Sequence, residues 1–244
     1  MLKVGVFGTC RIDNYNFDDF IKKTKNYPYI YTNKKFIINI RPLGYTVSSS
    51  EVLQNLMLIN NKKYLNISNK FIFNNIFLKH GGRTYIKNIN YDYLVIEICS
   101  KKKIIHKPTN YIFPYEIEGR HNKSNFHILI EDESETINNI IKIRDLINCK
   151  IILLPPIIEI KNFIKEKNTD VIYNKILDNR TNLIKILKKV SVEKNIYFID
   201  WNELIIKEGI SKMLVDQWHF TNYGKKYISK TIINKILSIN NSEK

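Results

Sequence analysis

Three residues near the two ends of the chain have the types and spacing needed for nucleophilic catalysis. Cys10 follows a short β-type run that ends in glycine, and Asp216 precedes His219 by three residues. An aspartate at this distance can bond one imidazole nitrogen, which leaves the other nitrogen to act as a base. A thiol at a strand end, beside Arg11 and within reach of a histidine, favours the reactive thiolate. These residues therefore predict a Cys-His-Asp site, provided that the fold brings both chain ends together.

Each of these residues also has a simpler interpretation. Cys10 can contribute to an oxyanion hole without covalent chemistry, or pack as a small buried hydrophobic residue, as most free cysteines do. A D-x-x-H loop alone can carry an ordinary surface histidine. Cys99 and Cys149 lie in or beside apolar runs, so we expect them to be packing residues. Three widely spaced cysteines form neither a disulfide framework nor a zinc pattern.

Taken together, the first and last motifs resemble those of the SGNH (GDSL-like) hydrolase superfamily. That superfamily has a Gly-x-Ser motif after its first strand and a D-x-x-H motif before its last helix. Residues 8–10 read Gly-Thr-Cys here, and residues 216–219 read Asp-Gln-Trp-His. A cysteine in place of the serine is similar to the Gly-x-Cys relatives, including the capsule-biosynthesis acetyltransferase-like branch. The resemblance implies that Cys10 is the nucleophile, that His219 is the base, and that Asp216 orients His219.

The resemblance also implies an oxyanion hole at the ends of the inner strands. Its donors would be the backbone N–H groups of Cys10 and Gly44, joined by Ser100 where the superfamily has an asparagine. The stretch from Glu97 to Ser100 has neither the glycine nor the asparagine of the family's third block. Because the loss of one such donor typically costs ~10²–10³ in rate, this difference predicts weaker hydrolysis.

Basic residues in flexible stretches are the candidates for substrate binding: Arg11, His80, Arg83 and Lys101. The segment from His80 to Arg83 contains two glycines and could grip a phosphate or a sugar, or form a simple turn. The run from Lys101 to Lys103 could hold an anionic substrate or a coenzyme A phosphate, or be a solvated charge run.

Glu97 lies in an expected buried strand, where a carboxylate requires a partner, and Arg11 or Arg41 is the partner that we expect. The sequence contains no Walker loop, no dinucleotide-binding glycine motif and no metal-ligand cluster. We therefore expect no cofactor, apart from an acyl-coenzyme A donor if the enzyme is a transferase.

The candidate residues require a fold in which several strand ends meet. Apolar, β-branched runs alternate with helical patterns, which predicts βαβ units. The expected fold class is α/β: a single-domain, three-layer α/β/α structure with a central parallel sheet, of the SGNH or flavodoxin-like type. This domain spans residues 1–244, with 240–244 frayed and 61–90 unassigned. The expected strands are 2–8, 36–40, 93–98, 151–154 and 196–199, and the expected helices are 49–60, 131–148, 174–194 and 221–237.

Two local features tie the site to these elements. Ser48 and Glu51 form a capping box, which places the start of a helix at about residue 49. In open α/β sheets the site lies outside the carboxyl ends of the strands. The loops that would meet there are 8–13, 41–50, 98–103 and the segment after Asp200.

The net charge of +16 and the pI of about 9.6 suggest a protein that binds polyanions. However, 33 lysines stand against six arginines, and the lysines are scattered along the whole chain. A nucleic-acid binder clusters its basic residues and favours arginine. We therefore expect no specific nucleic-acid partner. The excess of lysine over arginine is instead what the codons of an A- and T-rich genome would produce.

The location that the sequence favours is the cytoplasm. The longest apolar run, 151–160, contains two prolines and is too short to span a bilayer. The first residues do not read as a signal peptide, and the odd cysteine count fits a reducing compartment.

The function that these features favour is acyl transfer, by an esterase or an O-acyltransferase. The resemblance implies an acylated sugar or polysaccharide as the substrate, so the expected partner is a small molecule or a glycan. Two alternatives fit the same residues: a catalytically decayed glycan-binding module on this fold, and a polyanion or nucleic-acid binder.

Overall fold

A seven-stranded sheet organises the protein, whose computed structural model describes residues 1–9, 21–22, 29–32, 37–60, 90–113, 123–158, 169–216 and 219–242. The strands lie in the order β10-β9-β5-β1-β4-β3-β2. Five of them are parallel: β1 (Leu2–Gly8), β4 (Ile37–Tyr45), β5 (Tyr93–Glu97), β9 (Lys150–Leu154) and β10 (Ile196–Phe198). At the β4 edge, β3 (Tyr29–Thr32) and β2 (Ile21–Lys22) continue the sheet in antiparallel fashion.

The order of the parallel strands confirms the predicted fold class. Numbered along the chain, the five parallel strands lie in the order 2-1-3-4-5, which is the flavodoxin-like arrangement of a doubly wound sheet. β1 therefore lies inside the sheet, between β4 and β5. In this arrangement ligands bind outside the carboxyl ends of the strands, where the chain leaves β1, β4 and β5.

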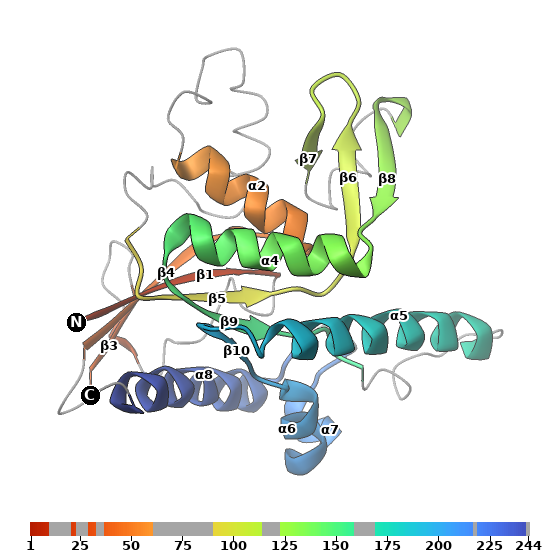
Figure 1. Cartoon of the computed structure of the whole chain (residues 1–244). Helices are drawn as coiled ribbons and strands as arrows, with labels where there is room; N and C mark the ends of the chain where they lie inside the picture. Colours follow the sequence, from red (N-terminus) through yellow and green to blue (C-terminus); the bar gives the residue numbers. More distant parts are fainter. Residues whose placement is uncertain are drawn as a thin grey trace.

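Helices cover both faces of the sheet (Figure 1). One face is covered by α2 (Ser49–Asn60), α4 (Glu133–Ile147) and α5 (Thr169–Val190). The other is covered by α6 (Trp201–Glu208), α7 (Ile210–Met213) and α8 (Asn222–Ser242). Because strand side chains alternate, Val6 packs with the α8 layer and Phe7 packs with the α2 and α4 layer. The predicted three layers are therefore present.

Capping residues explain where the helices begin and end. The Ser48 hydroxyl accepts the Glu51 backbone N–H at 3.3 Å, and α2 spans the predicted 49–60. α4 is shorter than the predicted 131–148, because Asp132 caps its start by accepting the Glu135 N–H at 2.7 Å. Asn148 ends α4 in the left-handed region, with a φ of 45°.

A second sheet was not predicted from the sequence. It consists of β6 (Lys102–His106), β7 (Tyr111–Phe113) and β8 (Phe126–Ile130), in the order β7-β6-β8, with a short 3-10 helix η5 (Lys123–Asn125) before β8. It continues from the end of β5 and rises away from the main sheet (Figure 1). The apolar cluster beside this sheet is small and centres on Leu58 of α2 and Phe113 of β7.

Further differences concern short or terminal elements. β2, β3, α6 and α7 were not predicted, and β4 runs to Tyr45 rather than ending at Ile40. α8 continues to Ser242, so its last turn includes residues that were expected to be frayed. Among the described helices, none combines the length and the apolar character needed to cross a membrane.

A close backbone contact joins α8 to α7 at Gly224. A Cβ atom at this position would lie 2.2 Å from the Met213 carbonyl oxygen. We expect Gly224→Ala to lower the free energy of unfolding by about 2 kcal/mol, since backbone must move to relieve the overlap. Urea unfolding measures this loss. Asn234→Ala, at an exposed position of the same helix, is the control and should not destabilise the protein, because alanine is the better helix former. Equal effects of the two substitutions would contradict the contact.

Candidate active site

The D-x-x-H loop is held at its base by an antiparallel bridge between Leu214 and Phe220. Inside this bridge the Val215 N–H donates to the His219 carbonyl oxygen at 2.9 Å. Leu214 and Phe220 are both buried, and Phe220 packs edge-on against the Trp201 ring. The loop is therefore anchored by apolar contacts, while the side chains of Asp216 and His219 are partly exposed to solvent.

Asp216 and His219 form the pair that their spacing predicts. The Asp216 Oδ2 atom lies 2.8 Å from His219 Nδ1, and Asp216 Oδ1 accepts the His219 backbone N–H at 2.8 Å. One carboxylate thus fixes both the ring and the backbone of the histidine. The side chains are 51% and 42% exposed for His219 and Asp216, respectively. With Nδ1 engaged, Nε2 is the ring atom that can take a proton from a reacting group.

Thr221 connects this loop to the start of α8. Its N–H donates to the Met213 carbonyl oxygen at 2.8 Å and its hydroxyl donates to the Lys212 carbonyl oxygen. The same hydroxyl accepts the Gly224 N–H at 3.0 Å, so Thr221 caps α8. Thr221 therefore also joins α7 to α8.

The end of β1 is held by a buried carboxylate. Glu97, at the end of β5, accepts both the Thr9 N–H at 2.9 Å and the Thr9 hydroxyl at 2.7 Å on Oε2. Thr9 and Glu97 are 4% and 0% exposed. Thr9 precedes Cys10, so this contact fixes the residue next to the candidate nucleophile. The expected partners of Glu97 were Arg11 and Arg41; Arg11 and the Arg41 side chain lie outside the described part of the structure.

The two further oxyanion candidates belong to β4 and to the segment after β5, the two strands that flank β1. Gly44 is inside β4, in register with Phe7, and not in the loop where it was expected, because the β1–β4 ladder extends to Tyr45. Ser100 lies just after β5, where its N–H donates to the Val47 carbonyl oxygen at 2.9 Å. Its hydroxyl oxygen accepts the Lys102 N–H at 3.0 Å.

The lysine run after β5 has structural contacts. Lys103 forms an ion pair with Glu135 on α4, and the Lys101 carbonyl oxygen accepts the Glu131 N–H at 2.8 Å. The pKa of Asp132 is lowered, chiefly by the Glu135 backbone N–H, and Lys101 adds a smaller effect. Lys101 is half-buried, and its side chain lies near the start of α4. The remaining candidates, Cys10, Arg11, His80 and Arg83, lie outside the described residues.

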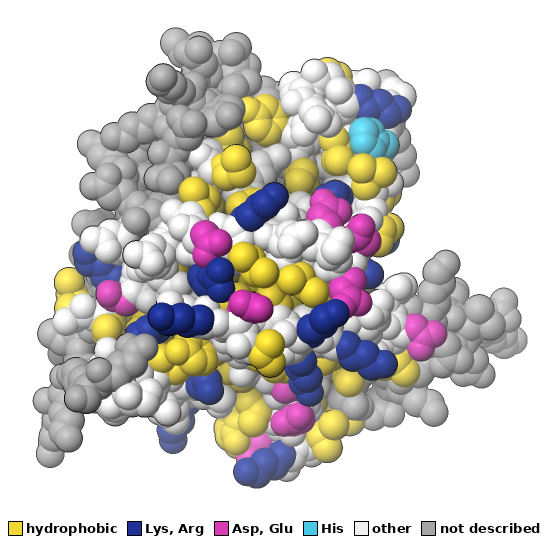
Figure 2. All heavy atoms as spheres, in the orientation of Figure 1, with side chains coloured by type: hydrophobic (Ala, Val, Ile, Leu, Met, Phe, Trp, Pro, Cys, Tyr) yellow, Lys and Arg dark blue, Asp and Glu magenta, His cyan; other side chains and the backbone are white. Residues whose placement is uncertain are grey.

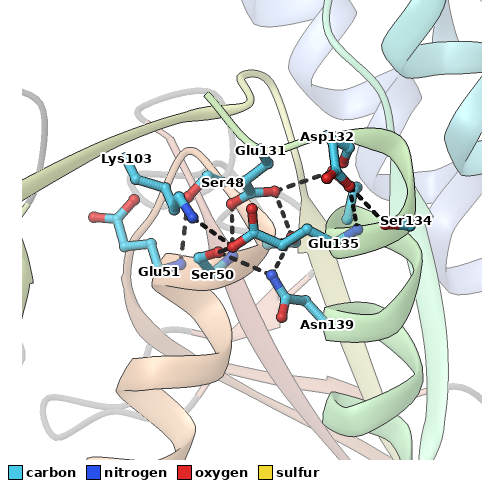
Figure 3. Close-up of polar contacts among 11 residues, drawn as sticks. Ser48, Ser50, Glu51, Lys103, Glu131, Asp132, Ser134, Glu135 and Asn139 are labelled. Carbon is cyan, nitrogen blue, oxygen red and sulfur yellow. Dashed lines mark hydrogen bonds and ion pairs between the residues drawn. The ribbon is translucent and has the colours of Figure 1, made fainter. Parts of the chain in front are cut away.

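A buried polar network joins the starts of α2 and α4 (Figure 3). Glu131 accepts the Ser49 hydroxyl at 2.6 Å, the Ser50 N–H at 2.9 Å and the Thr136 hydroxyl at 3.1 Å. The Asn139 amide donates to the Ser50 hydroxyl oxygen at 2.8 Å. The sequence predicts only the capping box in this region, because Ser49 and Ser50, the partners of Glu131 on α2, are about 80 residues away along the chain.

The two described cysteines fit packing roles. Cys149 is buried, and burial raises its pKa to about 12, so it stays a thiol at neutral pH. Cys99 is half-buried at the end of β5, where its N–H donates to the Val47 carbonyl oxygen at 3.1 Å. Within the described ranges, no three His, Cys, Asp or Glu side chains are grouped in a way that could hold a metal ion.

Comparisons with known proteins add distant structural likenesses. No family model matches the chain, and no curated protein matches it. One similar structure is a catalytic mutant of Axe2, an acetylxylan esterase from Geobacillus stearothermophilus, with a TM-score of 0.45, 12% identity, and coverage of 96% of this chain and 94% of that one. Another is LAE5, an alpha/beta hydrolase enzyme from the metagenome of Lake Arreo, Spain, with a TM-score of 0.39, 9% identity and the same coverage. Neither likeness identifies a family for this chain.

The Thr9–Glu97 contact leads to a stability prediction. Glu97→Leu removes the acceptor of two buried donors at similar side-chain volume, and we expect it to cost about 3 kcal/mol in the free energy of unfolding. Glu97→Gln keeps an acceptor oxygen, so its cost should be less than half as large. Urea unfolding of the two variants provides the measurement. Equal losses for Leu and Gln would show that the carboxylate does not hold Thr9.

Proposed function

We propose that the protein is an acyl-transfer enzyme, an esterase or an O-acyltransferase, that uses Cys10, His219 and Asp216. The observation that carries this proposal is the Asp216–His219 pair, whose carboxylate bonds Nδ1 at 2.8 Å and leaves Nε2 to accept a proton. The doubly wound fold supports it, because Cys10 follows β1 where the strand ends meet.

In the proposed reaction Cys10 Sγ attacks the carbonyl carbon of an ester or a thioester, and His219 Nε2 takes the thiol proton. The tetrahedral intermediate collapses with loss of the alcohol or, from acyl-coenzyme A, of the coenzyme A thiol, and this leaving group takes the proton from His219. Water or an acceptor hydroxyl then attacks the Cys10 thioester, again with His219 as the base, and Cys10 leaves as the thiol. Asp216 stabilises the imidazolium that forms in each step.

The proposed oxyanion donors are the N–H groups of Cys10 and Gly44 and the Ser100 hydroxyl. The backbone contact from Ser100 to Val47, which follows β4, supports this role because it fixes Ser100 beside the strands that flank β1. Gly44 is paired in the strand ladder, so its contribution is the weakest of the three.

The proposed substrate is an acylated sugar or polysaccharide, bound with the help of Arg11, His80, Arg83 and Lys101. The exposure of His219 and Asp216 supports a bulky substrate, because both side chains can be reached from solvent. A transferase would take its acyl group from coenzyme A, whereas an esterase would pass it to water.

A glycan-binding module on the same fold is the second candidate. The sequence at the end of β5 favours it, since the stretch from Glu97 to Ser100 has neither the glycine nor the asparagine of the resembled superfamily. Polyanion binding has less support. Lysines on the face in Figure 2 lie among acidic and apolar side chains, and Lys188, Lys189 and Lys212 form ion pairs. Binding that keeps its strength as the salt concentration rises would exclude phosphate-backbone attraction.

The reactivity of Cys10 tests the proposed chemistry. At neutral pH we expect iodoacetamide to alkylate Cys10 at least tenfold faster than Cys99 or Cys149, because a histidine-paired thiol carries more thiolate. Alkylation should abolish turnover of an activated ester. Peptide mapping by mass spectrometry measures the alkylation of each cysteine.

Variants of the histidine pair separate the steps. His219→Ala should slow both alkylation and turnover, and Asp216→Asn should reduce turnover more than alkylation. Cys10→Ser distinguishes a serine-type hydrolase, which keeps esterase activity, from a thiol-dependent transferase. If Cys10 reacts no faster than the other two cysteines and Cys10→Ala leaves activity unchanged, the glycan-binding module becomes the better description.

A further inference from the structure

Val47 links the starts of α2 and β6 through its backbone. Its N–H donates to Glu51 Oε2 at 2.7 Å. Its carbonyl oxygen accepts the Cys99 N–H at 3.1 Å and the Ser100 N–H at 2.9 Å. The position of Ser100 therefore depends on Val47, and the position of Val47 depends on Glu51.

The Glu51 carboxyl group is buried, and only one of its oxygens accepts a hydrogen bond from a described residue. Glu51 is 1% exposed, and Oε1 makes no hydrogen bond within the described part of the structure. Figure 3 shows its carboxyl group turned away from the contacts around Glu131. Among the described residues, the Asn55 Oδ1 acceptor and the Thr46 hydroxyl are also buried without a hydrogen bond. Unpartnered buried polar atoms are rare in folded proteins, so three in one region require an explanation.

A proton on Glu51 Oε1 explains this pattern. Asn55 lies four residues after Glu51 on α2, so both side chains are on one face of the helix. Thr46 adjoins Val47, which already contacts the Glu51 carboxyl group. An O–H group on Glu51 supplies the donor that a carboxylate lacks, and it avoids burying a charge.

The surrounding charges favour the same state. Burial raises the pKa of Glu51 from 4.5 to about 7, against the effect of the Val47 and Ser48 N–H groups, and Glu131 adds to the increase. Glu51 is the one charged residue in the sequence of α2. The titratable side chains described on the neighbouring elements are Tyr93 and Glu97 on β5, Lys101, Lys102, Lys103 and His106 on and just before β6, Tyr111 on β7, and Glu131, Asp132, Glu133 and Glu135 at the start of α4. Of the two β6 lysines, Lys102 is exposed and Lys103 is paired with Glu135.

We propose that Glu51 is a positioning residue of the candidate active site, whose neutral carboxyl group holds Val47 and, through Val47, holds Ser100. Loss of this proton leaves a charge at a buried site; the carboxylate accepts the Val47 N–H more strongly, but the larger cost of burying the charge favours opening of the contact as the pH rises. A role for Ser100 in catalysis rests on the proposed function, whereas the link from Glu51 to Ser100 can be measured without any substrate.

The direction of the pH effect follows from the two pKa values of Glu51. The stabilisation of the Val47 contact by the neutral Glu51 carboxyl group is fully present below about pH 4.5, the pKa of an exposed glutamate. It is lost as the pH rises through about 7. Between pH 5 and 8 the equilibrium between the intact and the opened contacts of Val47 with Glu51 and Ser100 should shift towards the opened form on the order of 50-fold.

Amide hydrogen exchange of Val47, Cys99 and Ser100, corrected for intrinsic rates, tests the proposal on the full chain. In the natural sequence we expect their protection to fall on the order of 50-fold from pH 5 to pH 8. Glu51→Gln mimics the neutral acid, with an amide oxygen for Val47 and an N–H for Asn55, so its protection should stay constant. Glu135→Gln, a carboxylate of the same region without contact to Val47, is the control and should keep the natural pH dependence.

Two results decide the proposal. The same pH dependence in the natural protein and in Glu51→Gln would overturn it, and a dependence that is lost only in Glu51→Gln would support it. Both results are obtained even if the protein hydrolyses no ester, so failure of the proposed function is recognised separately. In an active enzyme, Glu51→Gln should also remove a decrease in kcat above neutral pH while leaving KM unchanged.

Discussion

The pairing of β1 with β4 on one side and β5 on the other is the constraint on which the candidate site depends. It brings three strand ends to one edge, and specific hydrogen bonds then join them. Thr46 N–H donates to the Gly8 carbonyl oxygen, Thr9 donates twice to Glu97, and Val47 accepts from the chain after β5. These contacts lie in a buried region, where an unmade hydrogen bond is costly, so they hold the three strand ends in fixed positions relative to one another.

The histidine of the proposed site is held by a different set of contacts. Its loop belongs to the α7–α8 connection on the opposite face from α2 and α4, and it is held by the Leu214–Phe220 bridge and by Thr221. In the proposed site, the residues around the end of β1 are therefore held by the sheet. The Asp216–His219 pair is held by the Leu214–Phe220 bridge and a helix cap. Because the two parts are held separately, the Asp216–His219 pair is exposed while the carboxyl groups of Glu51, Glu97 and Glu131 are buried.

The sequence predicts those features of this structure that depend on local patterns. The apolar run of β1, the capping box of α2 and the D-x-x-H spacing are all readable because the interacting residues lie within a few positions of each other. The contacts of Glu97 with Thr9 and of Glu131 with Ser49 and Ser50 could not be predicted, because these partners are more than 80 residues away. The β6–β8 sheet was missed for another reason: its strands are short and bury few apolar residues, so the alternation that identifies a strand is weak.

The central claim is that Cys10 carries the acyl group during the reaction. Rapid quenching after mixing with an activated acetyl ester, followed by peptide mapping, measures which residue becomes acetylated. The account predicts a transient acetyl group on the Cys10 peptide that accumulates in the first turnover and is absent from Cys99 and Cys149. Its rate of formation should fall in His219→Ala. An acetyl group that never appears on Cys10, or that spreads equally over cysteines and surface lysines, would contradict the account.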